Sequence, residues 1–101
     1  MLPFYEKLGE HYDEIHQYDL AEKYYLVAQK PRDAFAMYAR AKKFDEAKRI
    51  AKEYIPNKDI VEMYIKQAEQ FESEGCFAEA EQLYTAIRKP ELAIKMYQRV
   101  Q

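Results

Sequence analysis

The sequence is poor in the residues that build turns, disulfides and phosphate-binding loops. Its 101 residues include two glycines, four prolines, one cysteine and no tryptophan. A single cysteine, Cys76, excludes an intramolecular disulfide and fits an intracellular, reducing compartment. Two glycines are too few for a loop that cradles phosphate, and neither G-x-x-x-x-G-K-[ST] nor C-x-x-C occurs. We therefore expect no nucleotide site and no cofactor.

Charge of one sign and long apolar runs are missing as well. Sixteen basic and 18 acidic residues give a net charge of −2. Nucleic-acid-binding proteins concentrate basic residues on one face, so this balance does not favour a nucleic-acid partner. No apolar stretch approaches the length of a membrane span, and Met1-Leu2-Pro3 leads into a helical pattern without a signal peptide. We expect no membrane insertion.

What the sequence does contain is an internal repeat. K-P-R-D-A-F-A-M-Y at residues 30–38 returns 59 residues later as K-P-E-L-A-I-K-M-Y at residues 89–97. Self-similarity at a fixed interval is typical of stacked repeat proteins. The five identical positions are expected to set the turn and the inward face. At the other four positions we expect the copies to differ in what they contact: Arg32/Glu91, Asp33/Leu92, Phe35/Ile94 and Ala36/Lys95.

Helix breakers and apolar spacing predict seven helices and no strands. Prolines suit the first turn of a helix, Gly75 suits a helix end, and Pro56 disfavours helix in the residue before it. Between the breakers, apolar residues recur at helical spacing, as Leu8, Tyr12 and Ile15 do. The expected helices cover residues 3–16, 19–29, 31–41, 45–54, 57–74, 77–88 and 90 onward.

Short joints between such helices produce antiparallel hairpins, so we expect an all-α fold, a right-handed α-solenoid. Repeat arrays need capped ends for solubility, and no polar end helix is evident. We interpret the chain as a fragment of a longer solenoid, with Met1 added as a start residue. The last helix of the fragment would allow self-association. The expected divisions of the single fragment 1–101 are a long hairpin at 3–29, a short hairpin at 31–54, a long hairpin at 57–88 and the first helix of a truncated hairpin at 90–101.

Small and large residues alternate on the expected inward faces. Small residues let two helix backbones approach, and rings fill the volume beside them. The predicted packing residues are Tyr5, Leu8, Gly9, Tyr12, Ala21, Tyr25, Ala34, Met37, Tyr38, Ala47, Tyr64, Ala68, Phe71, Ala80, Tyr84, Ala93, Met96 and Tyr97.

The beginning of the chain follows a known repeat pattern. Y-E-K-L-G-E-H-Y at residues 5–12, A-E-K-Y-Y at residues 21–25 and Pro31 resemble the tetratricopeptide pattern W-x2-L-G-x2-Y, A-x3-F, Pro. The hairpin that starts at Pro31 is too short for a full tetratricopeptide unit. With Y-I-K-Q-A-E-Q-F-E-S-E-G at 64–75 and F-A-E-A-E-Q-L-Y at 77–84, the chain resembles the α-solenoids of the large intraflagellar transport subunits, in which degenerate tetratricopeptide hairpins follow propellers.

This resemblance implies a function without catalysis. It implies a scaffold segment of the intraflagellar transport B complex, which binds other subunits on the cytoplasmic side of the cilium or flagellum and at the ciliary base. The complex would serve cilium assembly and ciliary cargo transport. Two alternatives stay open: a stand-alone tetratricopeptide adaptor that binds a peptide segment, and a solenoid piece of another coat-like, propeller-plus-solenoid subunit.

No constellation of residues in the sequence indicates catalysis or a metal site. His11 and His16 are five residues apart, about 140° around a helix, so they cannot share a metal as i, i+4 partners do. Cys76 follows a turn and has no basic neighbour, which favours a packing role over a nucleophile. The basic cluster within residues 42–52 is interpreted as a solvated helix face, with an acidic partner as the alternative.

Acidic residues occupy the face on which tetratricopeptide arrays bind partners. The family resemblance places that concave face on the first helix of each hairpin, and helical spacing assigns to it Glu6, Glu10, Asp13, Glu69 and Glu72. Chaperone adaptors of this family hold a partner's carboxylates with basic residues, so acidic residues disfavour that use. A basic or helical partner segment fits better, and such binding would be salt-sensitive.

Overall fold

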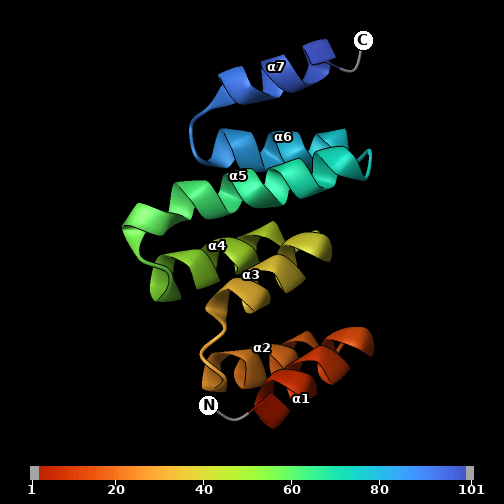
Figure 1. The fold of residues 1–101 in the computed structure, drawn as a ribbon, viewed down its shortest axis with the longest axis vertical. Helices are drawn as coiled ribbons and strands as arrows, with labels where there is room; N and C mark the ends of the chain where they lie inside the picture. The colour runs from red at the N-terminus through yellow and green to blue at the C-terminus, as the bar shows by residue number, and fades with distance from the viewer. Residues whose placement is uncertain (1–2, 100–101) are drawn as a thin grey trace. The chain divides into compact units, whose positions relative to one another are not determined.

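The computed structural model describes residues 3–99, and within that range the chain forms seven α-helices and no strand (Figure 1). The expected all-α helical repeat is confirmed. Residues 1, 2, 100 and 101, which the predicted ranges 1–101 and 90–101 include, lie outside the described part. The helices are α1 (Pro3–Glu14), α2 (Tyr18–Val27), α3 (Pro31–Arg40), α4 (Phe44–Tyr54), α5 (Asn57–Ser73), α6 (Phe77–Ala86) and α7 (Pro90–Arg99).

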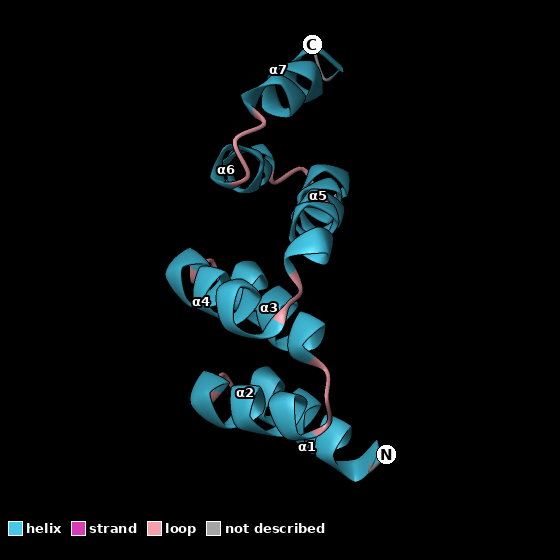
Figure 2. Cartoon of the chain, turned by 90° about the vertical axis from the view of Figure 1, so that its left-hand side faces the viewer, coloured by secondary structure: helices cyan, strands magenta, loops and turns pink. Residues whose placement is uncertain are grey.

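The helices belong to two compact units, and the boundary falls in the sequence between Pro56 and Asn57. In the first unit α1 packs on α2, α2 on α3, and α3 on α4; in the second unit α5 packs on α6 and α6 on α7 (Figure 2). Within each unit, every helix therefore packs on its neighbours in sequence, which is the arrangement of repeat proteins.

Five helices end in the same kind of turn, and only one of the five turns uses glycine. The backbone φ is 63° at His16, 61° at Gln29, 64° at Lys42 and 61° at Arg88, and it is 79° at Gly75. A residue with positive φ cannot continue a right-handed helix. Helices α1, α2 and α6 therefore end two residues earlier than the spacing of apolar residues predicted.

Backbone hydrogen bonds close each of these turns. The residue after the positive-φ position donates its N–H to the carbonyl five residues back, as Gln17 does to Tyr12 at 2.8 Å and Lys30 to Tyr25 at 2.8 Å. This is the Schellman motif, which satisfies carbonyls at the end of the helix. Helix α4 ends differently: Ile55 is extended before Pro56, with φ −107° and ψ 131°, as its position before proline predicts.

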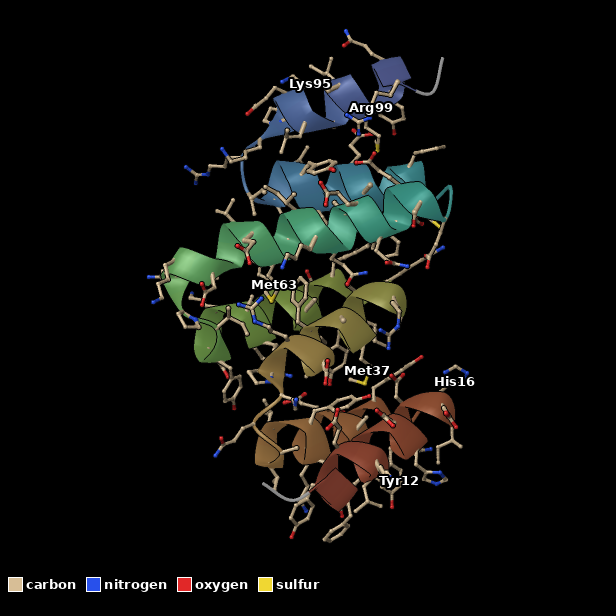
Figure 3. All side chains as sticks on the ribbon, in the orientation of Figure 1. Tyr12, His16, Met37, Met63, Lys95 and Arg99 are labelled. Carbon is tan, nitrogen blue, oxygen red and sulfur yellow. The ribbon has the colours of Figure 1, made fainter. Side chains whose placement is uncertain are left out.

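The core is a thin layer in which fully buried alanines alternate with larger side chains. Four of the predicted packing residues are only half-buried, and the other fourteen are buried. The half-buried ones are Tyr5, Leu8, Tyr12 and Tyr97. Two of them lie at an edge of the first unit, where the Tyr24 ring stacks between Tyr5 at 6.1 Å and Tyr12 at 5.6 Å. Figure 3 shows Tyr12 pointing away from α3.

One expectation about an individual side chain is wrong. Ile15, predicted to face inward with Leu8 and Tyr12, is 49% exposed because α1 ends before it. At the variable position held by Phe35 and Ile94 the two copies do differ: Phe35 is only 1% exposed and belongs to the core, whereas Ile94 is 57% exposed. Further buried residues absent from the predicted packing set are Ala28, Ala39, Ile50, Ala51, Ile55, Met63 and Leu83.

Replacing Gly9 by alanine is expected to lower the free energy of unfolding by about 1 kcal/mol, although alanine is the better helix former. A Cβ on Gly9 would lie 2.7 Å from Cδ1 of Tyr25 and 2.9 Å from its Cε1. Tyr25 is buried, so its ring cannot move aside freely. Urea denaturation of the two proteins measures the change.

Ala68, which stands 59 residues after Gly9, provides the reciprocal variant. Ala68→Gly removes a fully buried methyl group and adds backbone entropy to the unfolded chain, so it too should lower stability by about 1–2 kcal/mol. A stabilising effect of Gly9→Ala would show that the two helices of the first hairpin can move apart to admit the methyl group without a loss of stability.

Candidate functional site

A carboxylate in the first unit joins three successive helices. Asp13 of α1 accepts hydrogen bonds from the hydroxyl of Tyr25 on α2, at 3.4 Å, and from Nη2 of Arg40 on α3, at 2.8 Å. We call such a group, a carboxylate that accepts from a tyrosine and an arginine on the next two helices, a clamp. A clamp ties three successive helices together and so links a hairpin to the helix next to it in sequence.

The same arrangement occurs one helix further along. Glu22 of α2 accepts from the hydroxyl of Tyr38 on α3 at 2.6 Å, and from Nη2 and Nη1 of Arg49 on α4 at 2.7 and 3.3 Å. The Glu22 side chain is 17% exposed. Arg49 also donates from Nε to Glu46 at 2.9 Å, so its guanidinium is held on two sides. This second clamp is the most extensively hydrogen-bonded of the three.

The second unit holds a third clamp. Glu72 of α5 accepts from the hydroxyl of Tyr84 on α6 and, at 2.5 Å, from Nη2 of Arg99 on α7. Figure 3 shows Arg99 on α7. Each member lies 59 residues after its counterpart in the clamp of Asp13. In all three clamps the arginine follows the carboxylate by 27 residues.

The clamps give two predicted partner-binding residues a structural role within their own units. Asp13 and Glu72 both bind an arginine of their own unit. Sequence reasoning treated them as members of an acidic face and did not single out Arg40 or Arg99. The signal was present, because acid, tyrosine and arginine all recur at the interval of the repeat.

The electrostatics of the Glu22 clamp follow from burial and from its two donors. Burial opposes ionisation of Glu22, but the hydrogen bonds from Arg49 and Tyr38 outweigh it and hold the pKa of the carboxyl below its usual value. Burial, with the hydrogen bond to Glu22, raises the pKa of the Tyr38 hydroxyl. The hydrogen bond to Glu22 likewise raises the pKa of Arg49. The pair is therefore ionised and the tyrosine neutral around pH 7.

The tyrosines of the other two clamps behave alike. Burial and the charge of Asp13 raise the pKa of Tyr25, and burial with the hydrogen bond to Glu72 raises the pKa of Tyr84. Both hydroxyls therefore stay protonated and donate. These shifts keep a donor in place; they do not poise a group to exchange protons near neutral pH.

Three of the predicted partner-binding residues lie together in the first unit. A hollow of about 370 Å³ is lined by Glu6, Glu10, Asp13, Glu14, Tyr25, Asp33 and Arg40. We call it the acidic hollow. Burial and then the charge of Glu6 raise the pKa of Asp33. The negative charges that line the hollow therefore repel one another. Within the hollow, Arg40 is engaged with Asp13 at 2.8 Å.

The two remaining predicted residues lie in the second unit. Glu69 is exposed on α5, and Glu72 is half-buried in its clamp. Their surroundings therefore differ, although both were assigned to the same face.

The residues considered for catalysis or metal binding have ordinary surroundings. His16 Nδ1 lies 2.8 Å from the hydroxyl of Tyr18, and the His11 ring packs edge-on against Tyr12. Cys76 is half-buried at the start of α6. In the described part of the chain no three His, Cys, Asp or Glu side chains gather as a metal ion would require. Within residues 3–99 no helix combines the length and apolar character of a membrane span.

The basic cluster is partly used within the first unit. Arg49 belongs to the clamp of Glu22, and the Lys43 ammonium lies 5.8 Å from the centre of the Tyr18 ring. That distance is typical of a cation–π contact.

Comparison with known proteins identifies relatives along almost the whole chain. No family model matches, and no solved structure matches. The intraflagellar transport protein 172 homolog of Homo sapiens is 33% identical over 96 residues, which are 95% of this chain and 6% of that protein. Intraflagellar transport protein osm-1 of Caenorhabditis elegans is 35% identical over 97 residues, 96% of this chain and 6% of the relative.

A relative from a green alga agrees with these two. Intraflagellar transport protein 172 of Chlamydomonas reinhardtii is 34% identical over 100 residues, 97% of this chain and 6% of that protein. The chain thus spans about 6% of the length of these curated relatives. The similarity agrees with the resemblance that the repeats and hairpin lengths indicated. The chain belongs to the intraflagellar transport protein 172 family, as the homologue of one segment of its members.

Proposed function

We propose that this chain is a non-enzymatic scaffold segment of an intraflagellar transport B complex subunit and binds other subunits of that complex. The role would be exercised at the cilium or flagellum and its base, in cilium assembly and cargo transport. The names of the relatives support the transport role. The observation that carries the scaffold role is the set of clamps, because charged side chains that could do chemistry are used to hold successive helices together.

The acidic hollow is the proposed contact surface for a basic segment of a partner. Glu6, Glu10 and Asp33 line it, and the one arginine in its lining is already engaged with Asp13. Burial, and after it the charge of Glu6, raises the pKa of Asp33, and a lysine or arginine of a partner would offset the repulsion from Glu6. A stand-alone adaptor that binds a basic peptide would use the same surface, so the identity of the captured protein separates the two proposals.

The scaffold proposal predicts that the tagged chain captures intraflagellar transport subunits from extracts of ciliated cells. Reversing two charges of the hollow with Glu6→Lys and Glu10→Lys should reduce that capture at least tenfold, because a basic segment would then be repelled. Quantitative mass spectrometry of the captured proteins gives the readout.

A control variant keeps the test specific. Glu62→Lys reverses an exposed charge on α5 outside the hollow and should leave capture unchanged. Capture through the acidic hollow should also weaken as salt rises, because exposed charges are screened. Equal capture by the native chain, the Glu6→Lys, Glu10→Lys variant and the Glu62→Lys control at every salt concentration would rule out the acidic hollow as the contact surface. Capture of a single non-ciliary protein would favour the adaptor.

A further inference from the structure

The acidic hollow has a fixed place relative to the clamp of Asp13. Glu6 precedes Asp13 by seven residues on α1, and Asp33 stands at the same interval before the clamp's arginine on α3. Seven residues are about two helical turns, so each pair shares one side of its helix. The ion pair between the two helices therefore places Glu6 and Asp33 opposite each other, and both residues line the hollow.

The second unit repeats this arrangement with apolar residues. Ile65 precedes Glu72 by seven residues on α5, and Leu92 stands at the same interval before Arg99 on α7. The ion pair between these two helices places Ile65 and Leu92 opposite each other, and both are half-buried. Val61, one turn before Ile65, is 39% exposed. An acidic pair in the first unit is thus an apolar pair at the same place in the second.

One acidic residue of the first hollow is retained beside the apolar pair. Glu69, the counterpart of Glu10, is exposed on α5 one turn after Ile65. Among residues 57–99 the ion pairs are those of Lys66 with Glu62 and of Arg99 with Glu72, so Glu69 has no basic partner there. An apolar surface beside this carboxylate is complementary to a segment that carries apolar and basic side chains one helical turn apart.

We propose that Val61, Ile65 and Leu92 form a docking site for an amphipathic helix of a partner protein. We call these three residues the apolar patch. Apolar side chains of the partner helix pack on the patch, and a lysine or arginine one turn further along pairs with Glu69. The inference rests on the proposed scaffold function and deepens it, because it gives the second unit a contact of different chemistry from that of the acidic hollow.

The repeat leaves this place open to a partner and does not fill it with a helix of the chain itself. In the first unit the equivalent place is the acidic hollow, which is lined by residues of α1, α2 and α3 alone although α4 follows and packs on α3. Helix α4 lies beside Glu22 of α2, where its arginine binds. A helix in the equivalent position after α7 would therefore lie beside Glu81 of α6 and would not cover the apolar patch.

The direct test uses a synthetic probe, an alanine-based helical peptide of about 16 residues with two leucines one turn apart and an arginine one turn further on. These positions match the spacing of Val61, Ile65 and Glu69 on α5. Titrated into the intact chain with labelled methyl groups, the peptide should shift the NMR signals of the apolar patch. Glu81→Gln on α6 is the control variant and should bind the peptide as the native chain does.

Exchanging residues between the two units tests the apolar contact. Ile65→Glu with Leu92→Asp gives the second unit the residues that the first unit carries at those positions, and it should weaken peptide binding at least tenfold. The reverse exchange, Glu6→Ile with Asp33→Leu, should add a second binding site of similar affinity in the first unit. A gain of binding cannot result from a failure to fold.

The basic side chain of the peptide is tested through Glu69. Glu69→Gln should weaken binding about two- to fivefold, the effect of one exposed ion pair. With glutamine in place of the arginine in the peptide, Glu69→Gln should weaken binding no further, because the two side chains act on each other.

Three results would overturn the proposal. One is a peptide that shifts no methyl signal of the apolar patch, and another is a pair of exchanges that neither removes binding from the second unit nor adds it to the first. The third is a set of patch signals that shift with protein concentration in the absence of peptide, which would assign the patch to a second copy. None of these results affects capture of transport subunits by native Glu6 and Glu10, so the scaffold proposal is tested separately.

Discussion

Replacing Tyr38 by alanine is expected to lower the free energy of unfolding by about 3–5 kcal/mol. The Tyr38 ring is 2% exposed and lies 6.3 Å from the ring of Tyr18. Its hydroxyl donates to Glu22, so the substitution removes both the buried ring and one donor of the clamp. Urea denaturation followed by far-ultraviolet circular dichroism measures the loss.

Two further variants divide that loss between the ring and the hydroxyl. Tyr38→Phe keeps the ring and removes the donor, and it should cost about 1–2 kcal/mol. Tyr97→Ala removes the counterpart in the second unit and should cost much less than Tyr38→Ala, because Tyr97 is only half-buried. Equal losses for Tyr38→Ala and Tyr97→Ala would mean that the two units use their tyrosines in the same way.

The sequence predicted the helices well because their signals are local. Pro31 and Pro90 mark the beginnings of α3 and α7, and Pro56 follows the end of α4. The ends of α1 and α2 were placed too late for an equally local reason. His16 and Gln29 adopt the positive φ that glycine usually provides, and neither residue type predicts a positive φ at that position.

The clamps were missed because their parts lie on different helices. Each acidic residue was judged by the face of its own helix, where Asp13 resembles its solvated neighbours Glu6 and Glu10. Its arginine stands 27 residues away, beyond any local pattern. Only the coincidence of acid, tyrosine and arginine at the repeat interval could have revealed the pairing.

The register of the repeat also could not predict burial. Phe35 and Ile94 hold the same position in the two copies, yet one is buried and the other exposed. Burial depends on what packs against a helix, and a repeat interval fixes only which side of the helix a residue occupies. The positions that vary between copies are therefore not uniformly surface positions.

Thin layers make the clamps energetically important. Many buried residues are alanines, which contribute little apolar area. A domain whose net stability is about 5–15 kcal/mol can depend strongly on a few charged hydrogen bonds worth about 1.5–3 kcal/mol each. The clamp tyrosines contribute both apolar burial and a charged hydrogen bond, because the ring fills the layer and the hydroxyl donates to the carboxylate at the margin of the layer.

Glu22→Gln is expected to lower the free energy of unfolding by about 2 kcal/mol at pH 7. Glutamine keeps the shape of the side chain but removes the charge that Arg49 binds at 2.7 Å. Because the hydrogen bonds from Arg49 and Tyr38 hold the pKa of Glu22 below its usual value, the clamp contributes its full stability above about pH 4.3, the value typical of an unfolded chain. That contribution is lost as the pH falls through the pKa of the folded state, where Glu22 becomes protonated.

The difference between the native protein and Glu22→Gln should therefore disappear in acid. Urea denaturation at a series of pH values from 7 down to 2 tests this, because the difference should shrink steadily below about pH 4.3 and protonated glutamate resembles glutamine in shape and charge. Glu81→Gln is the matched control, because Glu81 accepts from Tyr97 at the same place in the repeat and is exposed. It should change stability by no more than about 0.5 kcal/mol at any of these pH values. A difference for Glu22→Gln that stays the same size from pH 7 to pH 2 would assign its effect to packing and not to the ion pair with Arg49.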